Sequence, residues 1–144
     1  IGTRGQALAL RAQAAELGLT EVVHFSGYQE GAELEQRLTA ADVGIIPMLP
    51  ASGVTVPYKV ADYLRHGAAV INSLPGELAQ YLEAFECGLA YTTRNAESLA
   101  DAMRSYATSP LGLENAQIKA RELFAAKFDR AKIYPAFAEW VTGG

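Results

Sequence analysis

Residues 56–71 read VPYKVADYLRHGAAVI, a short helical pattern that continues directly into an apolar strand pattern. Pro57 suits the first turn of a helix, because the N–H that proline lacks would be unpaired there. Residues 68–72 are apolar on both faces up to Asn72, which is typical of a strand covered by helices on each side. The stretch therefore indicates an α/β domain with a buried parallel sheet.

Strand and helix patterns alternate along the rest of the chain. Apolar or β-branched runs predict strands at residues 21–26, 43–47, 68–72 and 88–91. Helical spacing predicts helices at residues 6–17, 32–40, 57–66, 78–85, 95–107 (with Asn95 as N-cap), 116–128 and 131–141. Short connections between these segments predict a Rossmann-like, doubly wound parallel sheet with helices on both faces. Ligands of such sheets bind outside the carboxyl ends of the strands.

The size and charge of the chain narrow the classes of protein it can belong to. At 144 residues it predicts one Rossmann-like domain over residues 1–144, with terminal helices over residues 113–144. The formal net charge of −4 comes from scattered residues and provides no continuous basic face. Nucleic acid is therefore not an expected partner.

Cysteine and histidine usage argues against a metal or disulfide framework. Cys87 is the single cysteine, which suits a reducing compartment and a buried structural thiol. His24 and His66 have no further ligand at metal-binding spacing, so no metal site is expected.

No run reaches the roughly 18 apolar residues of a membrane span. We expect a cytoplasmic protein and leave open a peripheral contact with the inner face of the membrane.

The connection before the helix at Pro57 lies where a ligand would bind. It follows the strand at residues 43–47 and contains Ser52 and Gly53. The peptide amides of residues 54–56 and the helix dipole would attract a phosphate group at this point.

Asp62 lies about 7.5 Å of helical rise beyond Pro57. A carboxylate at that distance can accept hydrogen bonds from the two vicinal hydroxyls of a ribose. The structural alternative is an ion pair with Lys59 or Arg65, three residues away on each side. Lys59 could equally neutralise a diphosphate or remain solvated.

Four segments in order resemble the C-terminal, donor-binding half of a GT-B glycosyltransferase, most similar to the retaining enzymes of glycosyltransferase family 4. They are VVHFSGY (22–28), ADVGIIP (41–47), VPYKVADYLRHGAAVI (56–71) and CGLAY (87–91). By this resemblance, the last acid of the family's Glu-x7-Glu motif corresponds to Asp62 and holds the ribose. The first acid falls on Val54, so contacts to the donor sugar would come from backbone amides, Ser52 or Thr55.

The resemblance also implies roles for residues outside that motif. Gly27 and Tyr28 would flank the nucleobase, whereas the structural alternative for Tyr28 is a half-buried aromatic ring. Arg4, in a segment similar to a glycine-bearing strand end, could contact phosphate, and Glu77 could reach the sugar. For both, an ordinary surface or helix-terminus role is the favoured interpretation.

The implied parent is a retaining hexosyltransferase of bacterial polysaccharide biosynthesis. It would move a sugar from a nucleotide diphosphate sugar to a glycan or lipid-linked acceptor, with no metal and no other cofactor. By the same resemblance, the acceptor site would lie in an N-terminal domain that this chain lacks, and a basic pair that contacts the diphosphate would lie in the strand-loop-helix unit just before Ile1. We therefore expect a fragment without turnover, with no assignable catalytic residue, that binds nucleotide in the high micromolar range or more weakly.

Two alternatives remain from the sequence: a non-catalytic α/β interaction module with a vestigial pocket, and a nucleotide-sugar epimerase. The terminal helices carry an aromatic set that would form an exposed apolar face and favour dimerisation. Its members are Phe128, Tyr134, Phe137 and Trp140.

Overall fold

The computed structural model describes residues 4–49, 53–129 and 131. The chain divides into two compact units, residues 1–36 (unit 1) and residues 37–144 (unit 2). Each unit is described by itself below. The prediction of a single domain over the whole chain stays a prediction.

Unit 1 consists of helix α1 (Arg4–Glu16) and an irregular segment that follows it. The predicted strand at residues 21–26 is wrong, because a strand needs a partner for its ladder hydrogen bonds and the described part of unit 1 contains no other strand. Instead, the Arg11 guanidinium donates to the carbonyl oxygen of Phe25 at 3.1 Å and lies 5.0 Å from the centre of its ring. Arg4 is likewise in α1 and not at a strand end.

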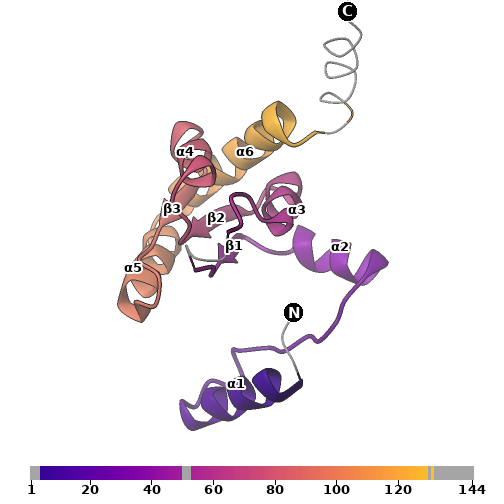
Figure 1. The fold of residues 1–144 in the computed structure, drawn as a ribbon, viewed down its shortest axis with the longest axis vertical. Coiled ribbons are helices and arrows are strands. Elements are labelled where there is room, and N and C mark those ends of the chain that lie inside the picture. Colours follow the sequence, from indigo (N-terminus) through magenta and orange to yellow (C-terminus); the bar gives the residue numbers. More distant parts are fainter. Residues whose placement is uncertain (1–3, 50–52, 130, 132–144) are drawn as a thin grey trace, which may run out of the picture. The chain divides into compact units, whose positions relative to one another are not determined.

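Helix α2 (Gly31–Thr39) spans the division between the units. All elements that follow α2 in the chain belong to unit 2. These are β1 (Val43–Ile46), α3 (Tyr58–His66), β2 (Ala69–Asn72), α4 (Glu77–Ala84), β3 (Gly88–Ala90), α5 (Ala96–Ala107) and α6 (Pro110–Lys127). The strands form a parallel sheet in the order β1-β2-β3 (Figure 1). This confirms the predicted Rossmann-like α/β architecture.

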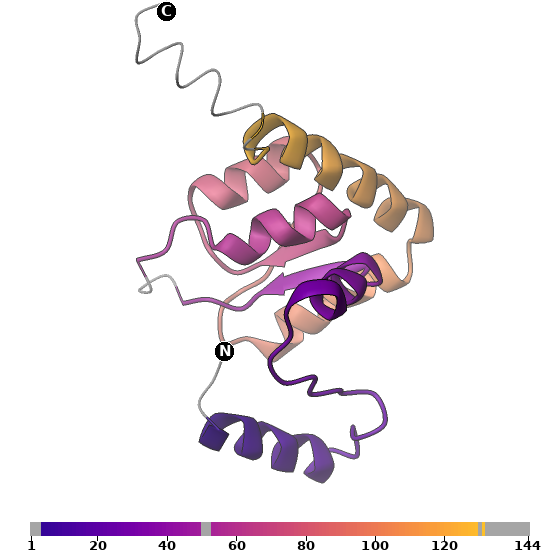
Figure 2. The same ribbon diagram turned by 90° about the vertical axis from the view of Figure 1, so that its right-hand side faces the viewer.

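Successive side chains of β2 point to opposite faces of the sheet, and a hydrophobic core lies on each face. Val70 packs with buried side chains of α3 and α4, whereas Ala69 and Ile71 pack with those of α5. Figure 2 shows α3 and α4 on one side of the strands and α5 on the other. Helix α6 serves both cores, because Ala116 joins the α5 side and Leu123 joins the α3 side. The all-apolar strand pattern is explained by this double coverage.

One glycine allows helix α3 to pack close to the sheet, and another ends the helix. A Cβ atom on Gly44 of β1 would lie 2.2 Å from the Tyr63 ring, so only glycine lets that ring lie against the strand. Gly67 ends α3 in the left-handed conformation (φ 77°). Arg121 of α6 donates to the carbonyl oxygen of His66 at 3.3 Å and places a positive charge at this helix terminus.

The last described helix differs from its predicted bounds. Helix α6 begins at Pro110, six residues before the predicted start at residue 116, because Ser109 caps it and accepts a hydrogen bond from the Gly112 amide at 3.3 Å. Proline at the first position is compatible with this start. Residues 132–141 of the second predicted terminal helix lie outside the described residues.

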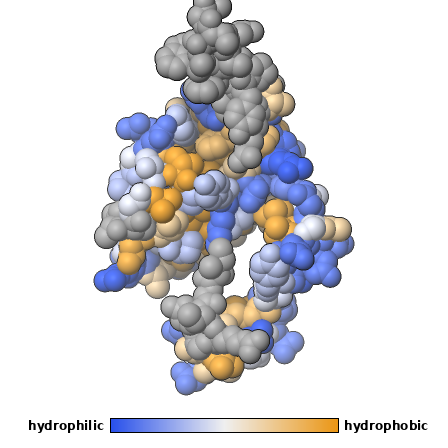
Figure 3. Space-filling view, turned by 45° about the vertical axis from the view of Figure 1, so that its right-hand side comes forward, coloured by the Kyte–Doolittle hydropathy of each residue, from blue (hydrophilic) through white to orange (hydrophobic). Residues whose placement is uncertain are grey.

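Phe128 does not belong to an open apolar face. It is half-buried, packs against the α3–α4 core, and meets the Tyr81 ring edge-on with 6.4 Å between ring centres. The predicted exposed face is therefore wrong for this residue, and its other three members lie outside the described residues. On the side seen in Figure 3, hydrophobic residues reach the surface in separate groups among hydrophilic ones.

Over the described residues, no helix is both long enough and apolar enough to cross a lipid bilayer.

Candidate functional site

Three helix N-termini share one edge of the unit 2 sheet. Each of the parallel strands is followed by a connection and then by a helix, so α3, α4 and α5 all begin at the carboxyl edge. Ligands of open parallel sheets bind at this edge. The three N-termini differ in how their first amides are satisfied, and that difference distinguishes them as sites.

The N-terminus of α3 has no side-chain cap. Pro57 is the N-cap of α3 and not, as predicted, a residue of its first turn, so the helix begins one residue later, at Tyr58. Pro57 has extended dihedrals (φ −68°, ψ 143°) and makes no side-chain hydrogen bond to the first turn. The amide of Val60 is bonded to the Pro57 carbonyl oxygen at 3.0 Å. Gly53 (φ 69°) and Thr55, which precede the cap, are exposed. No side chain within the described residues therefore satisfies the first turn of α3, and a phosphate site at this point stays a prediction.

The outer face of α3 carries the two charged residues predicted for the donor. Val60 and Leu64 are buried beneath the helix, whereas Tyr58, Lys59 and Asp62 are exposed. Within the described part of the chain, no ion pair joins Lys59 to Asp62. The Asp62 carboxylate nevertheless acts on its neighbour. The pKa of Tyr63 is raised first by burial and then by this negative charge.

The N-terminus of α4 combines a glycine with an oriented acid. Gly76 adopts φ 93° and offers no side-chain cap. Glu77 is exposed and accepts a hydrogen bond from the Tyr81 hydroxyl at 2.5 Å. Because this acid lies in the first turn, it has the dipole-matching position that the structural interpretation gave it.

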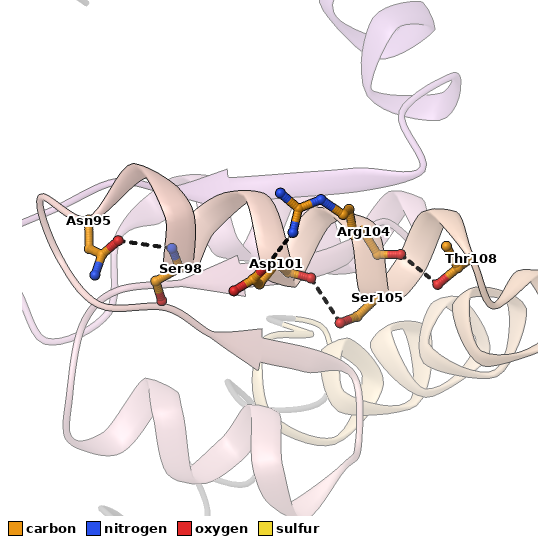
Figure 4. A network of polar contacts seen from close by, with 6 residues as sticks. All are labelled: Asn95, Ser98, Asp101, Arg104, Ser105 and Thr108. Atoms are coloured by element: carbon orange, nitrogen blue, oxygen red, sulfur yellow. Dashed lines mark hydrogen bonds and ion pairs between the residues drawn. The ribbon is translucent and has the colours of Figure 1, made fainter.

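The N-terminus of α5 is satisfied by its own side chain. Asn95 Oδ1 accepts a hydrogen bond from the Ser98 amide at 3.0 Å, which confirms the predicted N-cap. Further along α5, Asp101 pairs with Arg104, and Ser105 and Thr108 donate to backbone carbonyls one turn earlier (Figure 4). These polar groups serve the helix itself.

A shallow hollow of about 400 Å³ lies along α5 and not at α3. Leu89 and Ala90 of β3 form one wall, and Glu97 and Asp101 belong to the other. Its acids disfavour a phosphate group, and its helix is already capped. We therefore place the candidate site at the α3 N-terminus on chemical grounds and not in this hollow.

A buried polar pair occupies the centre of the carboxyl edge, and the sequence patterns did not identify it as important. Asn72 and Ser73 are 3% and 9% exposed, respectively. Asn72 closes its own turn, because its side-chain oxygen accepts from the Leu74 amide at 3.0 Å and its nitrogen donates to the Leu74 carbonyl at 2.7 Å. The available signal was a pair of hydrogen-bonding residues at the end of an otherwise apolar strand, one at its last position and one directly after it.

The residues predicted to flank the nucleobase, Gly27 and Tyr28, belong to unit 1. Gly27 adopts φ 72°, with open space where a Cβ atom would stand. Tyr28 is 85% exposed and donates to the Glu30 carboxylate at 3.0 Å, so the half-buried alternative is wrong. Of the residues predicted in unit 2, Gly53, Val54, Thr55, Lys59 and Asp62 occupy one continuous stretch before and within α3. Ser52 lies outside the described residues.

Cys87 is a packing residue, as its apolar context indicated. Its side chain is fully buried in the α3–α4 core, and burial raises the pKa of its thiol to about 11. In the described part of the chain, no group of three or more His, Cys, Asp or Glu residues could hold a metal ion. Independence of metals stays a prediction.

Comparison with known proteins identifies the family. Solved structures similar to this chain include sucrose-phosphate synthase from Thermosynechococcus elongatus (TM-score 0.81, 21% identity, 96% of this chain and 34% of that one). HepE from Anabaena is similar in its complex with UDP (TM-score 0.78, 20% identity, 96% and 37%) and with UDP-glucose (0.82, 19%, 100% and 38%).

The chain thus spans just over a third of the length of these structures. No curated protein matched it by sequence. The model of the family described as glycosyl transferases group 1 matches residues 1–109. With this match and the Rossmann-like GT-B fold, the chain belongs to the glycosyl transferases group 1 family.

Proposed function

We propose that this chain is the donor-binding half of a retaining glycosyltransferase that uses a nucleotide diphosphate sugar. The observation that carries the proposal is the α3 N-terminus. It has no side-chain cap, it lies at the carboxyl edge of the sheet, and it is followed one turn later by an exposed carboxylate. The similarity to a protein solved with UDP and with UDP-glucose supports a nucleotide-sugar ligand.

The chemistry of α3 suits a diphosphate linked to a ribose. The first-turn amides and the helix dipole favour the negative charge of the phosphates, and the exposed Lys59 adds a cation. Asp62 would repel phosphate at the same position, but it can accept hydrogen bonds from both ribose hydroxyls beside it. Stabilising the leaving diphosphate in this way lowers the barrier to breaking the bond between sugar and phosphate.

The sugar and the base would be recognised by the flanking segments. Val54 replaces the acid that the family motif has at this position, so the sugar hydroxyls would meet Thr55, Ser52 and the backbone near Gly53. Gly27 and Tyr28 of unit 1 would contact the base. We assign the parent to hexosyl transfer onto a glycan or lipid-linked acceptor in bacterial polysaccharide biosynthesis. It would work in the cytoplasm without a metal ion, and its acceptor would be bound by a domain outside this chain.

The proposal is tested by titrating the chain with UDP, GDP and ADP by ligand-observed NMR. We expect preference for one base, a dissociation constant in the high micromolar range or weaker, and loss of binding in Asp62→Ala. Asp101→Ala is the matched control, because Asp101 is also an exposed helical acid but lies on the capped helix α5. Equal signals from all three nucleotides, unchanged by Asp62→Ala, would instead support an interaction module without a donor site.

A further inference from the structure

Ser73 forms hydrogen bonds to the chain on both sides of its strand. Its hydroxyl oxygen lies 3.0 Å from the Ile46 carbonyl oxygen and 2.8 Å from that of Met48, and it can donate its proton to either. The same oxygen accepts a hydrogen bond from the Met48 amide at 3.1 Å. On the other side, the Thr93 hydroxyl donates to the Ser73 carbonyl at 3.4 Å.

These bonds begin where the sheet ladder ends. Ile46 is the last residue of β1 and pairs in register with Asn72, so Ser73 continues the connection beyond the last ladder pair. This one side chain accepts a hydrogen bond from the partly buried Met48 amide, and its single hydroxyl proton is within reach of the Met48 carbonyl oxygen, the nearer of the two carbonyls. The connection from β1 to α3 is thereby fixed at its start. At the end of this connection, α3 itself is fixed by the buried side chains of Val60 and Leu64.

We propose that Ser73 is a positioning residue for the donor site, an inference that rests on the proposed function. It does not contact the donor. It holds Met48, and through it influences how the segment Gly53–Val56 is presented before α3. Asn72 does not share this role, because its side chain bonds only within the turn to Leu74 in the described structure.

The energetic argument concerns Met48 and not Ser73 itself. Replacing the hydroxymethyl side chain of Ser73 by the methyl group of alanine removes the acceptor of the partly buried Met48 amide and the nearby donor of the Met48 carbonyl oxygen. A backbone group in that state gains stability by moving toward water, and the segment would shift with it. A binding site built from backbone amides loses affinity when those amides are displaced, because donors must lie within about 3.2 Å of the phosphate oxygens.

The test compares Ser73→Ala with Ser73→Thr, which retains the hydroxyl, and with Ser105→Ala. Ser105 is the matched control, because its hydroxyl also donates to a backbone carbonyl, at 2.9 Å, but on the exposed side of α5. Affinity is measured with the nucleotide, among UDP, GDP and ADP, that the unaltered chain prefers. Amide hydrogen exchange is measured without nucleotide at Met48, at Gly53–Val56, and at Val70 as an interior reference.

We expect Ser73→Ala to raise the dissociation constant about tenfold, to speed exchange at Met48 and Gly53–Val56, and to leave Val70 protected. Ser73→Thr should restore affinity to within about threefold, and Ser105→Ala should change neither quantity. Unchanged affinity with altered exchange would overturn the positioning role. So would a Ser73→Ala variant that does not fold, because Ser73 would then be a core residue. If no nucleotide binds the unaltered chain, the proposed function fails, whereas exchange at Met48 still decides whether Ser73 anchors this segment.

Discussion

Helices α3 and α5 follow the first and third strands of the same sheet, β1 and β3, yet their N-termini differ in how they are capped. Asn95 caps α5 with its own side chain and satisfies the Ser98 amide at 3.0 Å. Pro57 stands at the same position of α3, where it has neither a hydrogen-bonding side chain nor an N–H group. The first turn of α5 is capped by a side chain of its own, whereas α3 has no such cap and is the helix that we propose for ligand binding.

This difference explains why the hollow along α5 is not the preferred site. A capped helix has less to gain from an anion, and the acids beside α5 would repel one. At α3 the nearest acid is displaced by a turn from the first amides, where a ribose and not a phosphate would meet it. The comparison therefore favours α3 over α5 for the proposed donor site and gives the polar row of α5 a structural role.

The largest expected effect is the loss of α3 from its place on the sheet. Gly44→Ala would put a Cβ atom 2.2 Å from the Tyr63 ring, and the helix would have to move. We expect the free energy of unfolding, measured by urea denaturation, to fall by about 3 kcal/mol.

Gly53→Ala is the control for that substitution, because Gly53 has open space around its Cβ position and only its left-handed φ of 69° opposes a side chain. It should cost only about 1 kcal/mol. Equal losses for the two variants would show that Tyr63 does not pack as described.

A second substitution gives α3 the cap that α5 has. In Pro57→Asn the new side chain can accept hydrogen bonds from first-turn amides and would compete with phosphate. We expect nucleotide affinity to fall about tenfold, as measured by titration with the preferred nucleotide. Unaltered affinity would mean that the α3 amides do not contact the ligand.

The reciprocal change removes the cap of α5. Asn95→Ala should lower the free energy of unfolding by about 1 kcal/mol, because the Ser98 amide loses its partner. Nucleotide affinity should stay the same. A variant that lost affinity but not stability would reverse the roles assigned to the two helices.

The smallest expected effect near neutral pH is on the free energy of unfolding, and it comes from two buried groups that ionise at high pH, the Cys87 thiol and the Tyr106 hydroxyl. Burial raises the pKa of Cys87 to about 11 and that of Tyr106, on α5, to about 12. Because these folded-state values lie above the unfolded ones, their contribution to stability is complete below about pH 8.5 and is lost as pH rises toward 11 and 12. Urea midpoints should therefore be flat from pH 7 to 8.5 and fall above that. Cys87→Ser should remove part of the fall, and a steep fall below pH 8 would contradict the assignment.

Much of unit 2 could be predicted from the sequence. Its sequence patterns either depend on residues close together in the chain or come from strands that are covered by helices on both faces. The strand at Ala69–Asn72 is apolar on both sides and is covered by helices on both sides. Asn95 was recognisable as a cap because its side chain acts on a residue three positions away. The exposed stretch before α3 and Asp62 itself follow from position at a strand end and from helical spacing.

Other features depend on partners that a single sequence does not show. The segment at residues 21–26 has strand composition but no ladder partner in the described part of unit 1. Ser73 matters through Met48, a residue 25 positions away, and no local pattern reports such a bond. The early start of α6 was missed because Ser109 and Pro110 resemble a loop, although together they form a helix start.

The most direct measurement is a two-dimensional amide NMR titration of the chain with UDP. The account predicts chemical-shift changes at Gly53, Thr55 and the first amides of α3, with the amides of residues 97–99 at the capped start of α5 unchanged. Shifts confined to α5, or saturable binding that leaves the α3 amides unmoved, would contradict it.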